Sequence, residues 1–120
     1  MLQEGLGVDV QSLLERTVVV PKAAFSKADE RPTCVTHYSS LAVKKQLGTP
    51  KAILLVDDVV TAGRMLLSSV SKLKDAYPQT DVRAFALIRT MSGVEIQSVI
   101  SPCVGKIILC RDGERSYRQP

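Results

Sequence analysis

Residues 53–65, which read ILLVDDVVTAGRM, carry the clearest structural signal in the chain. The stretch begins with an apolar run that ends at two adjacent carboxylates, Asp57 and Asp58. A continuous apolar run of this kind is typical of a strand buried in a parallel sheet. A Thr-Ala-Gly turn follows, and apolar residues then recur at helical spacing as far as Ala76. The pattern therefore predicts a strand over residues 52–56, a tight turn and a helix.

The same stretch holds the groups that a sugar phosphate needs. Ligands of open α/β sheets bind outside the carboxyl ends of the strands. Carboxylates such as Asp57 and Asp58 accept hydrogen bonds from sugar hydroxyls. The unpaired backbone N–H groups at the start of a helix bind phosphate, and Gly63 allows the backbone to approach it closely. The residues predict a sugar-phosphate site.

The stretch resembles the ribose-phosphate signature of the type I phosphoribosyltransferases, which bind phosphoribosyl pyrophosphate (PRPP). The resemblance implies that Asp57 and Asp58 hold the 2′- and 3′-hydroxyls of the ribose. Many members carry a second Thr at the position of Ala62, but the orotate branch commonly carries Thr-Ala-Gly itself. The resemblance also implies a loop that wraps the 5′-phosphate, which comprises Val59, Val60, Thr61, Ala62, Gly63, Arg64 and Met65.

The fold that the resemblance implies is the Rossmann-like α/β fold of this family, in which helices flank a mainly parallel central sheet. The expected order of elements fits such a sheet. The family places a strand and a pyrophosphate-binding loop before the helix that we expect at residues 9–16, and that helix begins close to Met1. Three explanations stay open: the chain is N-terminally incomplete, a second chain supplies these parts, or the site binds PRPP without reacting.

The activity that the resemblance implies is transfer of phosphoribosyl from PRPP to a nitrogenous base, with release of pyrophosphate. This is a glycosyltransferase reaction of nucleotide metabolism. Mg²⁺ would come with the PRPP, and Asp57 and Asp58 would act by direct hydrogen bonds or through the metal. Some purine-salvage members have an Asp that acts as general base at the position of Thr61. The Thr at this position argues against that branch. No catalytic residue is assigned, and a non-catalytic binder of PRPP or a nucleotide, or a regulatory interaction domain, remains the alternative.

Three other interpretations of the acidic pair are weaker. A helix cap explains Asp58 or Thr61 by itself, but it requires neither a second acid nor a glycine loop. A receiver domain would carry a phosphorylatable Asp on a later strand, and none occurs between Asp81 and Asp112. The acidic strand of a nucleoside triphosphatase needs a G-x-x-x-x-G-K-[ST] loop, which the sequence lacks.

Composition limits the remaining classes of protein. The 120 residues suit one domain, spanning 1–120, with an ordinary apolar fraction of 45% and charged fraction of 23%. A net charge of +4 fits an anionic substrate, weak contact with nucleic acid or plain surface charge. Few aromatic residues make nucleic-acid binding a poor prediction. No long apolar segment predicts a membrane span or a signal peptide, so we expect a cytoplasmic protein. A sheet missing a strand would expose an edge, which favours a homodimer or a partner chain.

The three cysteines, Cys34, Cys103 and Cys110, have no C-x-x-C spacing and predict no disulfide framework. A zinc site that combines them with His37 is disfavoured because the chain has a single His. Cys103 and Cys110 adjoin an apolar segment and are expected in the core. His37 and Tyr38 either face the site or have structural roles at the surface, and the surface role is the preferred expectation.

The rest of the chain gives weaker expectations. We expect a helix over residues 9–16 and a strand over residues 17–20, which Pro21 ends. A long flexible loop is predicted over residues 22–37, where Lys22, Lys27 and Arg31 are basic groups that could contact a pyrophosphate. Further expected segments are a short strand or helical turn near residue 41, strands over 82–88 and 106–110, a strand or helical turn over 94–100, and a polar tail over 111–120 with a turn at Asp112-Gly113.

Overall fold

The core of the computed structural model is a strand, a helix and a second strand, β3 (Ala52–Val60), α2 (Arg64–Ala76) and β4 (Asp81–Arg89). β3 and β4 pair in parallel along their whole lengths. This confirms the elements predicted from the signature. β3, however, runs four residues beyond the predicted end, because two β-branched residues after the acidic pair continue the pairing with β4. Asp57 and Asp58 therefore lie within the strand, not after it.

The structure describes residues 7, 9–20, 31–98 and 101–119. Several expectations fall outside this part of the chain: the expected loop lysines Lys22 and Lys27, the strand end at Pro21, and the two residues 99–100.

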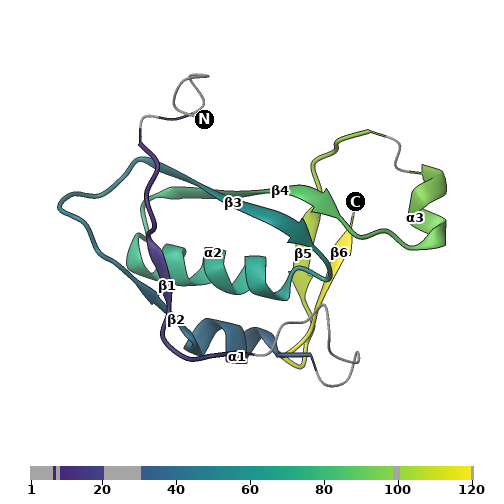
Figure 1. The fold of residues 1–120 in the computed structure, drawn as a ribbon, viewed down its shortest axis with the longest axis horizontal. Coiled ribbons are helices and arrows are strands. Elements are labelled where there is room, and N and C mark those ends of the chain that lie inside the picture. Colours follow the sequence, from purple (N-terminus) through teal and green to yellow (C-terminus); the bar gives the residue numbers. More distant parts are fainter. Residues whose placement is uncertain (1–6, 8, 21–30, 99–100, 120) are drawn as a thin grey trace.

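Helix α1 (Cys34–Ser39) packs on α2, and Figure 1 shows α2 lying between α1 and the β3–β4 pair. Thr33 caps α1, since its hydroxyl accepts a hydrogen bond from the backbone N–H of Thr36. Cys34 and His37, three residues apart, form the buried face of α1. The predicted loop over residues 22–37 is therefore wrong for its last residues.

The N-terminal described segment forms a strand, β1 (Leu14–Arg16), paired antiparallel with β2 (Leu41–Val43). The expected helix over 9–16 and strand over 17–20 are both wrong. The helical spacing of apolar residues is overridden because the backbone of β1 pairs with β2, whose Leu41 is buried in the core. The short strand expected near residue 41 is confirmed as β2.

The C-terminal part forms helix α3 (Gly93–Ser98) and a hairpin of β5 (Lys106–Leu109) and β6 (Ser116–Gln119). The strand predicted over 106–110 is confirmed. The turn expected at Asp112-Gly113 is confirmed too, with Gly113 at a φ of 73°. The expected polar tail over 111–120 is wrong for residues 116–119, because they pair with the apolar β5.

The sheet differs from the expected central one. The described strands form three separate two-stranded sheets, of which only β3–β4 is parallel. The α/β class is thus present with one parallel pair. The face of β3–β4 turned away from α2 is exposed and carries the apolar residues Leu54, Val56, Phe85 and Leu87, with Arg83 beside Leu54. Among the described residues, no helix is long and apolar enough to cross a membrane.

Candidate functional site

A cleft of about 680 Å³ lies at the carboxyl end of β3 and the start of α2. All nine residues that the signature predicts, from Asp57 to Met65, line it. Three basic residues from other segments line it as well, namely Arg16 from β1, Arg31, and His37 from α1. The fold therefore combines two carboxylates, a helix start and several cationic side chains in one concave site.

The carboxylates of the acidic pair accept hydrogen bonds from neighbouring backbone N–H groups. Asp57 Oδ1 accepts a hydrogen bond from the N–H of Asp58 at 3.0 Å, and Asp58 Oδ1 accepts one from the N–H of Val59 at 2.8 Å. The two carboxylate side chains also interact with each other. Burial raises the pKa of Asp57; the hydrogen bond from the Asp58 N–H opposes this rise, and the Asp58 carboxylate adds to it. The pair suits a ligand that donates hydroxyl hydrogens or carries a cation.

The start of α2 provides backbone donors. The first i→i−4 bond of the helix joins the N–H of Leu67 to the carbonyl of Gly63 at 2.8 Å. The N–H groups of the three residues before Leu67 therefore have no partner within the helix. The N-cap residue is Gly63, which has no side chain to cap this end. Unpaired N–H groups and the helix dipole together favour an anion here.

Gly63 has two structural reasons to be glycine. Its φ of 82° lies in the left-handed region. A Cβ atom at this position would also lie 2.6–2.9 Å from three side-chain atoms of Ile107 in β5. Close packing of the hairpin against the loop therefore requires a glycine at position 63, apart from any approach of a phosphate.

The Arg64 side chain binds protein groups. Its Nη1 donates to the carbonyl oxygens of Arg31 and Pro32, both at 3.2 Å. These bonds hold the segment before α1 against the start of α2. The part of Arg64 that fits the predicted phosphate loop is therefore its backbone N–H.

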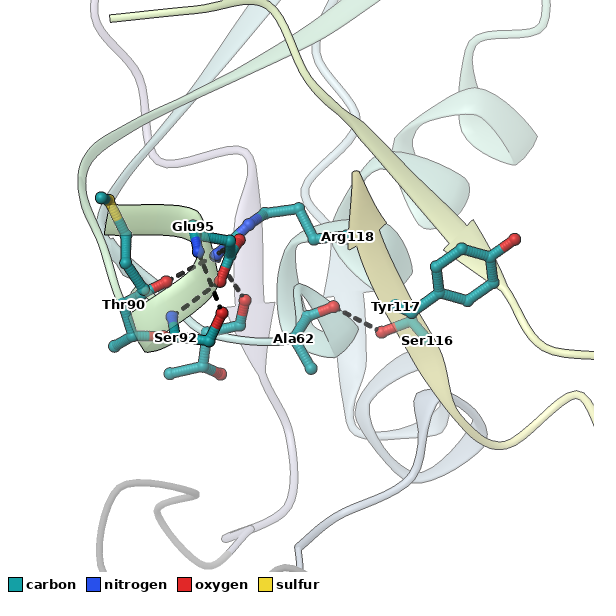
Figure 2. Close-up of a pocket in the computed structure, with 9 residues that line it drawn as sticks. Ala62, Thr90, Ser92, Glu95, Ser116, Tyr117 and Arg118 are labelled. Atoms are coloured by element: carbon teal, nitrogen blue, oxygen red, sulfur yellow. Dashed lines mark hydrogen bonds and ion pairs between the residues drawn. The ribbon is translucent and has the colours of Figure 1, made fainter. Parts of the chain in front are cut away.

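Arg118 of β6 holds the hairpin against the ends of both parallel strands, and Figure 2 shows this network beside a second pocket of about 400 Å³. Its Nη1 donates to the carbonyls of Val60 and Thr61 at 3.3 and 2.7 Å. Its Nη2 donates to the Thr90 carbonyl and forms an ion pair of 2.9 Å with Glu95. No local sequence pattern indicates that Arg118 holds the hairpin in place, since its contacts join residues far apart in the chain.

One local sequence pattern could have indicated part of this network. Ser92 and Glu95 have the S-x-x-E spacing of a capping box. The N–H of Ser92 donates to Glu95 Oε2 at 2.8 Å, and the N–H of Glu95 donates to Ser92 Oγ at 3.3 Å. The hydrogen bond from Ser92 and the contact with Arg118 hold the pKa of Glu95 at about 2.

The lowered pKa of Glu95 gives a testable dependence on pH. Because the folded-state value lies below the ordinary one, the ionised carboxylate stabilises the fold above about pH 4.5, and this contribution is lost as pH falls towards 2. We expect Glu95→Gln to lower the melting temperature at pH 7 and to reduce its fall between pH 5 and pH 3. Asp112, whose pKa is also about 2, contributes equally to both proteins. Parallel melting curves at all pH values would contradict the assignment.

His37 is a cleft residue that sequence analysis placed at the surface. It is only 6% exposed, and its Nδ1 is buried without a hydrogen-bond partner among the described residues. Burial lowers its pKa, and the positive charges of Arg16 and Arg64 lower it further. The expected surface role is wrong for His37, whereas Tyr38 is partly exposed and donates to the Asp75 carboxylate.

The cysteines are free thiols. Cys34 is buried, Cys110 is half-buried and Cys103 is exposed, so the expected core position of Cys103 is wrong. Within the described ranges, no group of three or more His, Cys, Asp or Glu residues could hold a metal ion. Comparison of the chain with protein-family models, with curated proteins and with solved structures found no match.

Proposed function

We propose that this chain binds PRPP, or a nucleotide through its 5′-phosphate, in the cleft between β3 and α2. The observation that carries the proposal is that Asp57, Asp58 and the start of α2 line one cleft. A ribose 5-phosphate needs acceptors for two adjacent hydroxyls and donors for one phosphate. The two carboxylates and the N–H groups of the helix start supply these at the same site.

In this proposal Asp57 and Asp58 accept hydrogen bonds from the 2′- and 3′-hydroxyls, and the N–H groups from Thr61 to Met65 bind the 5′-phosphate. The Mg²⁺ that accompanies PRPP would neutralise the charge that develops on the leaving pyrophosphate. The two adjacent carboxylates fit an ion that keeps most of its waters and substrate oxygens. The raised pKa of Asp57 supports this fit, because a cation or hydroxyl donor would relieve the cost of its buried charge.

The proposed reaction is phosphoribosyl transfer to a nitrogenous base. The bond between the ribose C1′ and the pyrophosphate oxygen breaks, and a bond between C1′ and a base nitrogen forms. Such a reaction proceeds mainly through positioning and charge stabilisation. In this reaction the protein would hold the ribose through Asp57 and Asp58 and the phosphate through the backbone N–H groups at the start of α2.

A non-catalytic binder is the second candidate function. The described residues before the signature form an antiparallel pair and a helix, and none of them adds a strand to β3–β4. That arrangement supports a domain that binds PRPP or a nucleotide without turning it over. We further propose that a second copy or a partner chain covers the exposed apolar face of β3–β4, since parallel strands are ordinarily covered on both faces.

Calorimetric titration of PRPP with Mg²⁺ tests the binding proposal. We expect one site per chain with a dissociation constant that rises with salt concentration. Release of pyrophosphate in the presence of nucleobases would then assign catalysis, and binding without release would assign the second function. If the protein took up neither PRPP nor ribose 5-phosphate, the proposed function would be wrong.

A further inference from the structure

One side of the cleft carries nitrogen atoms that lack partners. Arg31 Nε, His37 Nδ1 and Arg64 Nε are all buried without a hydrogen-bond partner in the described part of the chain. All three residues line the same cleft. Buried polar groups are hydrogen-bonded in the great majority of cases. Three exceptions in a single cleft therefore point to a polar ligand on this side.

The contacts of Arg64 place these residues together. Its Nη1 donates to the carbonyls of Arg31 and Pro32, which fixes Arg31 beside the start of α2. His37 follows on α1, whose buried face packs on α2. His37 as a whole residue is buried, with an exposed fraction of 6%. The group thus has a fixed position, and two of its three members carry a permanent positive charge.

We propose that Arg31, His37 and Arg64 form an anion-binding subsite in the cleft, separate from the backbone N–H groups at the start of α2. It receives a dianionic group such as a phosphoryl group. This inference rests on the proposed function. If a nucleotide or PRPP binds in the cleft, the subsite requires that this ligand carry a second anionic group besides its 5′-phosphate. Arginine forks and imidazole are suited to such a group.

Binding at this subsite is coupled to a proton on His37. Burial and nearby positive charges keep the pKa of His37 below its ordinary value, so the ring is neutral near pH 7. A bound dianion offsets the repulsion from the arginines and favours the protonated ring. Affinity for a dianion therefore rises as pH falls. Arg16 from β1 and Arg64 from α2 are the charged groups that act on the ring. Arg31, together with Asp57 and Asp58 from β3, lines the same cleft.

Sulfate is the probe that tests the subsite, because its charge does not change between pH 8 and pH 6. We expect the unaltered protein to bind sulfate more tightly at pH 6 than at pH 8. His37→Gln and Arg31→Gln should each weaken binding by about tenfold or more, and His37→Gln should remove the dependence on pH. Arg83→Gln is the matched control, since it removes one charge from an exposed site on β4 outside the cleft. Its sulfate affinity should not change.

Circular dichroism verifies that each variant is folded. If His37→Gln fails to fold, the sulfate affinity of Arg31→Gln and the pH dependence of sulfate binding by the unaltered protein test the proposal. The proposal is overturned if the protein does not bind sulfate, if the site variants bind it normally, or if Arg83→Gln loses as much affinity as they do.

A parallel titration of PRPP separates this proposal from the proposed function. If PRPP binds through Asp57 and Asp58 while His37→Gln keeps full affinity for PRPP and sulfate, the subsite is wrong and the function stands. If PRPP does not bind but sulfate binding depends on His37 and Arg31, the subsite stands and the function is wrong.

Discussion

Asp57→Asn combined with Asp58→Asn is expected to weaken binding of PRPP by at least about 100-fold. Each carboxylate supplies a charge-assisted hydrogen bond to a ribose hydroxyl, and each such bond contributes about 1.5–3 kcal/mol. Asparagine keeps the shape of the side chain but loses the charge, and with it the attraction for the Mg²⁺ of PRPP. Calorimetric titration of the variant beside the unaltered protein measures the loss.

The fold of this variant should survive. Burial raises the pKa of Asp57, so its charge opposes folding at pH 7, and this cost is absent below the ordinary pKa of an aspartate. The asparagine variant should therefore be no less stable than the unaltered protein at pH 7. Asp81→Asn is the matched control, because Asp81 lies at the amino end of β4, outside the cleft. Unchanged PRPP affinity in the double variant would refute the assignment of the acidic pair.

Gly63→Val is expected to destabilise the protein by about 2–5 kcal/mol. The left-handed conformation of residue 63 costs a non-glycine residue about 1–2 kcal/mol. Overpacking against Ile107 adds about 1–3 kcal/mol. Because a small domain is stable by only about 5–15 kcal/mol, urea unfolding should show the loss clearly.

The two causes can be separated with a smaller side chain and a cavity. Gly63→Ala retains the conformational cost, and adding Ile107→Ala removes the contact with the new Cβ. The coupling between these two substitutions should therefore be favourable when their free energies of unfolding are compared in a double-mutant cycle. Additive effects would show that Ile107 does not pack against Gly63. Loss of phosphate binding in Gly63→Val has meaning only at urea concentrations where the variant is folded.

The hairpin shows how distant residues complete the site. Arg118 lies 58 residues from Val60, yet its guanidinium bonds to the carbonyl at the end of β3. Ser116 Oγ likewise donates to the carbonyl of Ala62 at 2.8 Å, 54 residues away. The sequence offers no local pattern for such contacts. Only the capping box of Ser92 and Glu95 could be recognised in advance, because a capping box involves neighbouring residues.

The parallel β3–α2–β4 unit follows from local sequence patterns, because a continuous apolar run and a helical repeat are strong enough to specify their elements. The sequence also placed Asp57, Asp58 and the helix start beside one another, since they are adjacent in the chain. The strand β1 and the cleft positions of His37 and Arg31 depend instead on contacts between distant segments of the chain. Residues 14–16 form the strand β1 and not the expected helix, because pairing with β2 outweighs a weak local preference for helix. His37 and Arg31 line the cleft because α1 and the segment before it pack on α2.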